Sequence, residues 1–434
     1  MNIILLSGGS GKRLWPLSNE VRSKQFLKIF KNKEGFKESM VQRMYRMITE
    51  VDPNSTITIA TSENQIPQII DQLGDHVGIS IEPTRKDTFP AIALAAAYLK
   101  KQGVSGNEAV VVCPVDPYVE KDYFDCLKEL SDEASREGSA NLTLMGIEPI
   151  YPSTKYGYII PTNDKHIAPV HEFKEKPNEE KAQEYINKGA LWNGGVFAFK
   201  LNYVLEIALR LFGTDSYECL KKRYESLQKI SFDYAVVEHE KSISVIRFSG
   251  SWKDLGTWNT LSESMDEEAT GNVIMDSCHN THIINELKLP IIALGIIDAV
   301  IAATPDGILV TNKDKSTELK NYVADARPMY ERLEWGEYKV LDYQCHENGQ
   351  NNLTREIIIK PGYHTNYQSN NEMKLIWAFT EGIGEIIMDD IVKEIKCGEV
   401  AIINPGMKYA VKGITELHII EIQIGNDNAG AQVE

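Results

Sequence analysis

Residues 2–27 read NIILLSGGSGKRLWPLSNEVRSKQFL, and this stretch is the most informative part of the sequence about fold and function. Its aliphatic run at 3–6 predicts a buried strand. The next residues form a glycine-rich loop, Ser7, Gly8, Gly9, Ser10 and Gly11. Glycine lets a backbone turn sharply and lets its N–H groups approach an anion closely. Three cationic side chains accompany the loop and complete a predicted polyphosphate site: Lys12, Arg13 and Lys24.

The loop differs from two well-known phosphate-binding loops. No Lys-Ser or Lys-Thr pair follows the last glycine, as a Walker A loop would require. Leu14 stands where a dinucleotide-binding loop has its third glycine. On the glycines alone, an ordinary turn between a strand and a helix is an equal alternative.

Composition limits the classes of function that the chain can have. With 434 residues and 42% apolar content, it should hold two or more domains. Its net charge of −16 repels phosphates, so we expect no nucleic-acid partner, and a nucleotide would need a local basic loop plus a divalent cation. The six cysteines show no CxxC spacing, which favours free thiols in a reducing compartment. Without a signal peptide or an apolar run of membrane length, we expect a cytoplasmic protein that does not bind membranes.

Strands and helices should alternate from residue 1 to about 258. Apolar runs predict strands at 56–60, 77–81, 109–113 and 142–147, and helical periodicity predicts helices at 37–48 and 89–101. Such alternation favours an α/β fold with a doubly wound, mostly parallel, Rossmann-like sheet. Ligands of these sheets bind beyond the carboxyl ends of the strands. The glycine loop and residues 82–85 and 114–116 all follow predicted strands, so we expect them to meet at one edge.

Two of these polar segments also have plain structural interpretations. Asp116 precedes a proline and could simply be a turn residue. Asp87 or Thr88 could cap the helix that follows the segment EPTRKDTFPA at 82–91. Capping and ligand contact are compatible.

The string GGSGKRLWPLS followed by SKQFL resembles the signature of sugar-nucleotide pyrophosphorylases, in particular the mannose-1-phosphate guanylyltransferase branch. Further segments resemble the motifs of that family in the same order: EPTRKDTFPA at 82–91, YGYI at 156–159, FKEKP at 173–177, LWNGGVF at 191–197 and WKDLGTW at 252–258. The resemblance implies a nucleotidyltransferase that converts an NTP and a sugar 1-phosphate into an NDP-sugar and pyrophosphate. GTP and mannose 1-phosphate are the first choice of substrates.

The resemblance also implies roles for individual residues of this chain. It assigns Arg13 and Lys24 to catalysis. Nucleotide binding falls to Ser7, Gly8, Gly9, Ser10, Gly11, Lys12, Arg13, Glu82, Pro83, Arg85 and Thr88. The sugar phosphate would be bound by Gly157, Glu175, Lys176 and Asn193, and the cofactor Mg²⁺ by the carboxylates of Asp116 and Asp254. Read singly, Glu175 and Lys176 would be a surface charge pair and the turn around Asn193 would be structural.

Several positions depart from the family pattern. Asp87 replaces an asparagine, Phe89 replaces a small residue, and Pro117 replaces a histidine. These changes leave another nucleotide or another phosphorylated acceptor open. We interpret the segment FDYAVVE at 232–238 as mainly architectural.

The remaining sequence changes character to short β-rich runs. We divide the chain into a nucleotidyltransferase domain at 1–265, a β-rich extension at 266–315, a connector at 316–332 and a cupin-like β-barrel at 333–434. Strands are expected in the extension at 272–275, 282–285, 291–296, 299–303 and 308–311.

The last domain resembles the isomerase domain fused to many guanylyltransferases, but its metal-binding run QxHHHRxEHW reads QSNNEMKLIW at 368–377. Tyr409 stands where another histidine is expected. Since a zinc-type site needs three or four ligands, we predict that this barrel has neither metal nor isomerase activity. A non-catalytic, nucleotide-sugar-sensing subunit is the alternative to an enzyme, and we expect a homodimer in either case.

Overall fold

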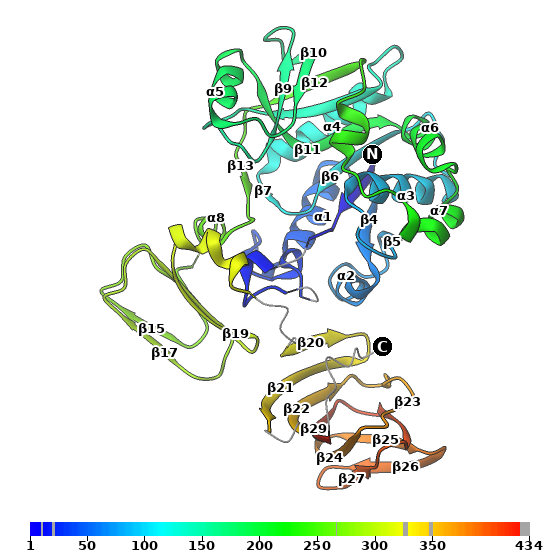
Figure 1. Ribbon diagram of the computed structural model, residues 1–434, viewed down its shortest axis with the longest axis vertical. Helices are drawn as coiled ribbons and strands as arrows, with labels where there is room; N and C mark the ends of the chain where they lie inside the picture. Colours follow the sequence, from blue (N-terminus) through cyan, green and yellow to red (C-terminus); the bar gives the residue numbers. More distant parts are fainter. Residues whose placement is uncertain (10–11, 20–21, 266, 324–328, 347–349, 426–434) are drawn as a thin grey trace. The chain divides into compact units, whose positions relative to one another are not determined.

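The computed structural model describes residues 1–9, 12–19, 22–265, 267–323, 329–346 and 350–425 (Figure 1). The chain divides into two compact units, one made of Met1–Ser10 and Ser23–Asp266, the other of Gly11–Arg22 and Glu267–Glu434. The opening stretch of the sequence is therefore shared between the two units. Predictions for Ser10, Gly11, the boundary at 266 and the connector residues 324–328 lie outside the described residues. In the described part of the chain, no helix is long and apolar enough to cross a membrane.

The first unit is built on a mixed sheet. Its described residues form nine strands in the order β5-β4-β1-β6-β11-β8-β12-β10-β9. Their bounds are β1 Asn2–Leu6, β4 Thr56–Ser62, β5 Gly78–Glu82, β6 Ala109–Pro114, β8 Leu142–Ile147, β9 Gly157–Pro161, β10 Ile167–Lys174, β11 Leu191–Lys200 and β12 Ile243–Phe248. The neighbouring strands among β5, β4, β1 and β6 pair in parallel. Strand β11 is antiparallel to both β6 and β8. Strand β10 is antiparallel to both β12 and β9. The α/β sheet is confirmed, and the reversal of β11 and β10 is an addition that the local sequence patterns did not indicate.

Helices cover both faces of this sheet, as the doubly wound prediction requires (Figure 1). Their bounds are α1 Met40–Val51, α2 Ile66–Leu73, α3 Thr88–Lys101, α4 Lys121–Ser135, α5 Glu179–Asn187, α6 Leu201–Phe212, α7 Tyr217–Arg223 and α8 Trp258–Ser262. One core cluster includes residues of α1 and α4, and a second includes residues of α3, α6 and α7. Helix α1 begins later than predicted because Ser39 and Gln42 form a capping box that fixes its start.

Shorter elements complete the first unit. They are the strand pairs β2 Phe30–Lys31 with β3 Lys37–Glu38 and β7 Pro117–Val119 with β13 Trp252–Asp254, the 3₁₀ turns η2 Lys24–Phe26, η3 Glu63–Gln65 and η4 Tyr224–Ser226, and the π-helical turn η5 Asp233–Val237. The pairing of β7 with β13 matters most for the site, because it joins segments that are more than 100 residues apart in the sequence.

The second unit begins with short strands of a β-rich extension. Their bounds are β14 Ala269–Thr270, β15 Val273–Asp276, β16 His282–Asn285, β17 Ile291–Leu294, β18 Ala299–Thr304 and β19 Gly307–Asn312, followed by the 3₁₀ helix η6 Asp314–Asn321. Five strands were predicted here to within two residues. Most neighbours pair in parallel, β14-β16-β18 in one sheet and β15-β17 in another.

The described residues 12–19 and 22 belong to the same unit as this extension, and they begin with the 3₁₀ turn η1 Lys12–Leu14. Thr304 donates its hydroxyl to the backbone oxygen of Pro16 at 3.0 Å. The guanidinium of Arg22 forms a bidentate ion pair with Glu286, with both N–O distances at 2.6 Å. Arg13 therefore belongs to the second unit, where its side chain is exposed.

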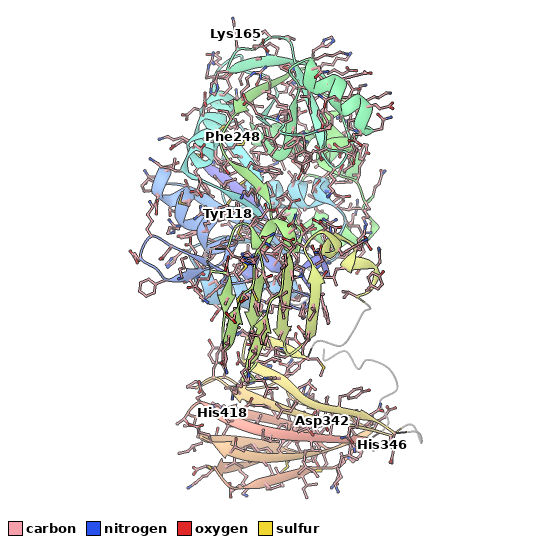
Figure 2. The ribbon with its side chains drawn as sticks, turned by 90° about the vertical axis from the view of Figure 1, so that its left-hand side faces the viewer. Tyr118, Lys165, Phe248, Asp342, His346 and His418 are labelled. Carbon is pink, nitrogen blue, oxygen red and sulfur yellow. The ribbon has the colours of Figure 1, made fainter. Side chains whose placement is uncertain are left out.

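From residue 329 on, the residues that the structure describes form strands and loops without a helix, as predicted for a cupin. One sheet has the order β20-β21-β22-β29-β24-β27 and the other β23-β28-β25-β26. The bounds are β20 Tyr330–Leu333, β21 Gly336–Cys345, β22 Asn351–Ile359, β23 Gln368–Ser369, β24 Met373–Glu381, β25 Ile383–Met388, β26 Ile391–Lys396, β27 Val400–Ile403, β28 Lys408–Gly413 and β29 Leu417–Gly425. Figure 2 shows the long strands of this part with their side chains. Asp342 lies on β21, His346 directly follows β21, and His418 lies on β29. A cluster of aliphatic and aromatic side chains from both sheets forms its core.

Candidate functional site

The root of the glycine loop is a buried polar cluster at the carboxyl end of β1. Ser7 is buried, and the amide of Gln25 donates to its hydroxyl at 3.1 Å and to its backbone oxygen at 3.3 Å. Gln65 in turn donates to the Ser23 hydroxyl at 2.8 Å. These hydrogen bonds fix the position of Ser7, the first residue of the loop. No described atom outside the neighbouring residues lies within 4 Å of where a Cβ would stand at Gly8, so the space above the loop is open.

The segment after β5 lies against this loop. A guanidinium nitrogen of Arg85 donates to the backbone oxygen of Gly9 at 3.0 Å. Asp87 caps α3 by accepting a hydrogen bond from the Thr88 amide, and the Thr88 hydroxyl accepts from the Phe232 amide at 2.7 Å. The structure thus brings together two of the predicted nucleotide segments, and the capping interpretation of Asp87 is confirmed.

Glu82 ends β5 in a partly buried position beside Tyr224. The tyrosine hydroxyl donates to its carboxylate at 2.7 Å. Burial raises the pKa of Glu82 to about 7, against the opposing effects of this hydrogen bond and of Arg85. Tyr224 is fully buried and comes from the distant turn η4. Tyr224 could not be predicted from the sequence, because no local pattern connects residues that are 142 positions apart.

Lys24, Asp116 and Asp254 form one cluster. The Lys24 ammonium lies 2.7 Å from a carboxylate oxygen of Asp116 and 3.9 Å from one of Asp254. The aspartates meet because Asp254 pairs with Pro117 across the β7–β13 ladder. A Cβ at Gly256 would lie 3.0 Å from an Asp254 oxygen, so the glycine gives that carboxylate its room. The three residues of the first unit for which catalysis or metal binding is predicted are therefore adjacent.

An aromatic group lines the same region. The ring of Tyr156 lies 5.1 Å from that of Trp192 and 5.4 Å from that of Trp252, measured between centroids. Burial, followed by the negative charges of Asp254 and Asp116, raises the pKa of Tyr156. The hydroxyl is thus kept protonated close to the two aspartates. This tyrosine stands in the YGYI segment, yet only Gly157 was singled out there.

The predicted sugar-phosphate residues also meet. A Cβ at Gly157 would lie 2.6 Å from a Glu175 carboxylate oxygen, which shows how closely that side chain approaches the glycine. The Glu175 carboxylate pairs with the Lys176 ammonium at 2.6 Å, and the glutamate side chain is only 7% exposed. Lys176 has a φ of 44°, a left-handed conformation that is strained for lysine and is often found at functional sites. A plain surface charge pair would require neither the burial nor the strain.

Asn193 completes this group, with a partner that was not expected. Its amide nitrogen donates to Asp233 at 2.6 Å, and its amide oxygen accepts from the Gly195 backbone at 3.1 Å. Asp233 belongs to the segment at 232–238 that we interpreted as mainly architectural.

The cupin part has a polar interior where a metal site was predicted to be lost. Gln368 donates to the Tyr409 hydroxyl at 3.3 Å. Arg355 forms an ion pair with the completely buried Glu421, which also accepts from the Trp377 indole at 2.6 Å. Across the described residues of the whole chain, no group of three or more His, Cys, Asp and Glu side chains could hold a metal ion.

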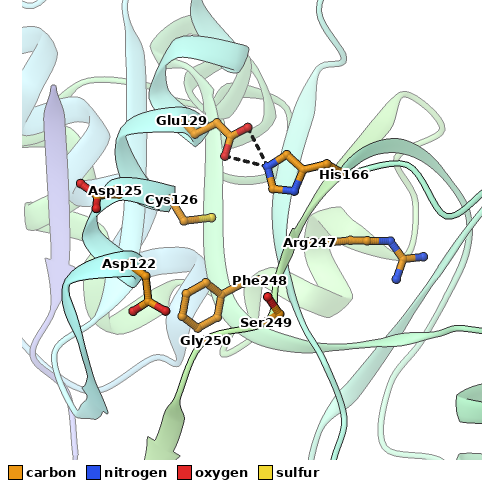
Figure 3. A pocket seen from close by; sticks show the side chains of 9 residues that line it. All are labelled: Asp122, Asp125, Cys126, Glu129, His166, Arg247, Phe248, Ser249 and Gly250. Carbon is orange, nitrogen blue, oxygen red and sulfur yellow. Dashed lines mark hydrogen bonds and ion pairs between the residues drawn. The ribbon is translucent and has the colours of Figure 1, made fainter.

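A separate pocket of about 280 Å³ lies between α4 and the end of β12 (Figure 3). Its lining is Asp122, Asp125, Cys126, Glu129, His166, Arg247, Phe248, Ser249 and Gly250. His166 and Glu129 are joined by contacts of 2.8 and 2.9 Å. None of the predicted site residues lines it.

The sheet order, the glycine loop and the Lys24 cluster define a nucleotidyltransferase. The chain belongs to the nucleotidyl transferase family, whose profile matches residues 2–271. Residues 321–431 match the profile described as mannose-6-phosphate isomerase C-terminal. Both assignments confirm the resemblances that the motifs indicated.

Relatives match over nearly the whole chain. Mannose-1-phosphate guanylyltransferase RfbM of Salmonella typhimurium is 29% identical over 465 residues, covering 97% of this chain and 94% of the relative. The alginate biosynthesis protein AlgA of Pseudomonas aeruginosa is 27% identical over 466 residues, covering 98% and 93%. A crystal structure described as mannose-1-phosphate geranyltransferase from Thermus thermophilus is similar with a TM-score of 0.62 and 28% identity, covering 74% of this chain and 97% of that one.

Proposed function

We propose that this chain is a mannose-1-phosphate guanylyltransferase, which makes GDP-mannose and pyrophosphate from GTP and mannose 1-phosphate. The observation that carries the proposal is the adjacency of Lys24, Asp116 and Asp254 at the edge of the sheet. The names of full-length relatives support the choice of sugar and nucleotide.

The chemistry needs positioning and charge neutralisation rather than a general base. The attacking sugar phosphate is already an anion near neutral pH, and it displaces pyrophosphate in line at the α-phosphorus. Lys24 would stabilise the negative charge of the reacting phosphates, and Arg13 that of the triphosphate. The backbone of residues 7–11 with Lys12 would bind the remaining phosphate oxygens.

Asp116 and Asp254 would hold the divalent cation, which we propose to be Mg²⁺. Two carboxylates, one at the end of β13 and one just before β7, fit this ion, because Mg²⁺ binds one or two protein oxygens and keeps its other positions for phosphates and water. When bound, the ion supplies charge neutralisation to both substrates. The close approach of Lys24 to both carboxylates supports the convergence of their oxygens on one point.

Glu82, Pro83, Arg85 and Thr88 would contact the nucleotide beyond its phosphates. The Glu82 carboxylate is suited to guanine, because a carboxylate accepts hydrogen bonds and guanine presents an N–H and an NH₂ side by side. Its place at the carboxyl end of β5, next to the loop that Arg85 ties to Gly9, supports this role.

Gly157, Glu175, Lys176 and Asn193 would bind mannose 1-phosphate. Glu175 would accept hydrogen bonds from sugar hydroxyls, and Lys176 would neutralise the phosphate. The burial of the Glu175 side chain and the strained Lys176 backbone support a binding role over a surface role.

The cupin part would have neither a bound metal nor isomerase activity. The interior positions are taken by the Gln368–Tyr409 pair and by the ion pair of Arg355 with Glu421, which supports a structural or ligand-sensing role. We keep the division into 1–265, 266–315, 316–332 and 333–434 as a proposal. We also propose that the protein is a cytoplasmic homodimer.

Pyrophosphate release with Mg²⁺, measured for four NTPs against several sugar 1-phosphates, tests this function. The proposal predicts a maximum with GTP and mannose 1-phosphate. A maximum elsewhere would mean that the replacements at Asp87, Phe89 and Pro117 have redirected specificity. Nucleotide binding with no release in any combination would favour the sensing subunit.

A further inference from the structure

The amide of Asn193 is fixed at both ends. Its oxygen accepts from the Gly195 backbone N–H, which can only donate, so the orientation of the amide is defined. Its nitrogen donates one hydrogen to Asp233 at 2.6 Å. One N–H of the amide remains for a further acceptor. Asn193 is 9% exposed, so this orientation is set inside the protein and not at its surface.

Asp233 is itself held firmly relative to Asn193. The preceding residue, Phe232, is fully buried, and its ring lies 4.5 Å from Phe197 and 5.9 Å from Phe199, between centroids. Both phenylalanines stand on β11, the strand that carries Asn193. Asp233 opens the π-helical turn η5, a rare conformation that is frequent at functional sites. The aspartate therefore has a fixed position above the strand that it contacts.

The same segment connects the two halves of the proposed site. The Phe232 amide donates to the hydroxyl of Thr88, a residue of the proposed nucleotide segment. Its neighbour Asp233 accepts from Asn193, on the sugar side. Burial and the nearby Glu175 raise the pKa of Asp233 to about 6, opposed by Asn193 and Lys176. A carboxylate that is partly buried beside another carboxylate is costly, which is unexpected for a residue with only an architectural role.

We infer that Asp233 is a positioning residue for the sugar substrate, which it serves by aiming the second N–H of Asn193 at a hydroxyl of the hexose 1-phosphate. This inference rests on the proposed sugar-phosphate site. The N–H of Asn193 donates and the carboxylate of Glu175 accepts. Together they match a pair of adjacent hydroxyls, since each hydroxyl can both donate and accept. Asp233 thus acts through Asn193 on the recognition of the sugar.

Steady-state kinetics of Asp233→Ala in the full chain test the inference. Loss of a charge-assisted hydrogen bond should raise KM for mannose 1-phosphate on the order of 10- to 100-fold. KM for GTP and kcat should stay within about threefold, because the nucleotide contacts and the reacting groups are untouched. Asp233→Asn keeps an oxygen acceptor of the same size, so it should restore most of the affinity.

A double-mutant cycle shows whether the effect passes through Asn193. Asn193→Ala alone should raise the same KM, and adding Asp233→Ala should raise it no further, since the two residues act as one unit. Asp298→Ala provides the matched control. Asp298 accepts from the Asn280 amide at 2.6 Å in the second unit, so the same chemical change is made at a similar pair outside the proposed site. Its KM values should equal those of the wild type.

The outcomes separate the inference from the proposal beneath it. If Asn193→Ala leaves KM for mannose 1-phosphate unchanged, the proposed sugar site is wrong. If Asn193→Ala raises it but Asp233→Ala does not, the inference is wrong and the site stands. Equal increases in KM for both substrates, with a lower melting temperature, would show that Asp233 is structural and would also overturn the inference. If the alanine variant does not fold, an Asp233→Asn variant with a KM raised at least tenfold would decide against it, because that variant keeps the acceptor.

Discussion

The buried ion pair of Arg355 with Glu421 provides a prediction about the stability of the cupin part. Glu421 has no exposed side-chain surface, and the Arg355 side chain is 16% exposed. Glu421 also accepts from the Trp377 indole at 2.6 Å and from the Gln423 amide at 2.7 Å. Glu421→Gln removes one charge and leaves the guanidinium buried without its counter-charge. Breaking a buried pair in this way costs about 3–5 kcal/mol of stability.

Hydrogen exchange of the intact chain can measure this cost locally. Backbone amides in β24 and β29 should exchange on the order of 100- to 5,000-fold faster in Glu421→Gln, since each 1.36 kcal/mol is tenfold. Peptides from β1 and β6, in the other unit, should not change. Replacing both partners, Arg355→Met together with Glu421→Leu, should lower the stability of the barrel less than Glu421→Gln does, because no charge is left buried.

Two outcomes would refute this reasoning. Unchanged exchange in Glu421→Gln would mean that the ion pair does not stabilise the barrel. The partners would be shown to act independently if the double variant lost as much stability as Arg355→Met and Glu421→Leu lose in sum.

Two further predictions concern the proposed substrate contacts. Gly157→Ala should raise KM for mannose 1-phosphate about tenfold, because its Cβ would lie 2.6 Å from the Glu175 carboxylate and displace it; an unchanged KM would contradict the contact. The preference for GTP over ATP should increase as the pH rises through about 7, where Glu82 loses its proton and becomes the acceptor that guanine needs. Tyr224→Phe removes the hydrogen bond that lowers the pKa of Glu82, so the rise in GTP preference should occur at a higher pH in this variant. A GTP preference of the wild type that stays constant from pH 5.5 to 8.5 would exclude Glu82 as the group that recognises the base.

Local sequence patterns were sufficient for most of the framework. The strands β1, β4, β6 and β8 lie where apolar runs predicted them, and each of them is buried along most of its length. The glycine loop and residues 82–85 and 114–116 could be placed at one edge because each follows a predicted strand. Lys24 and Asp254 were assigned from the family resemblance, and the structure places both next to Asp116.

What sequence reasoning missed depends on contacts between distant residues. Nothing near Tyr224 indicates that its hydroxyl meets Glu82, and nothing near Asp233 indicates that it meets Asn193. The place of residues 12–19 and 22 in the second unit has the same cause, since these residues contact distant partners such as Thr304 and Glu286. Such pairs follow from the packed fold and have no periodicity of their own.

We propose that the cluster of Lys24, Asp116 and Asp254 performs nucleotidyl transfer. Its most direct test is the rate of GDP-mannose formation from GTP and mannose 1-phosphate with Mg²⁺, compared among the wild type, Lys24→Ala and Asp254→Asn. The exposed Lys28→Ala is the matched control for the loss of a lysine. We expect rate losses on the order of 1,000-fold in both cluster variants, with GTP binding retained and the rate of the control variant unchanged. Rates within about threefold of the wild type in both cluster variants would contradict it.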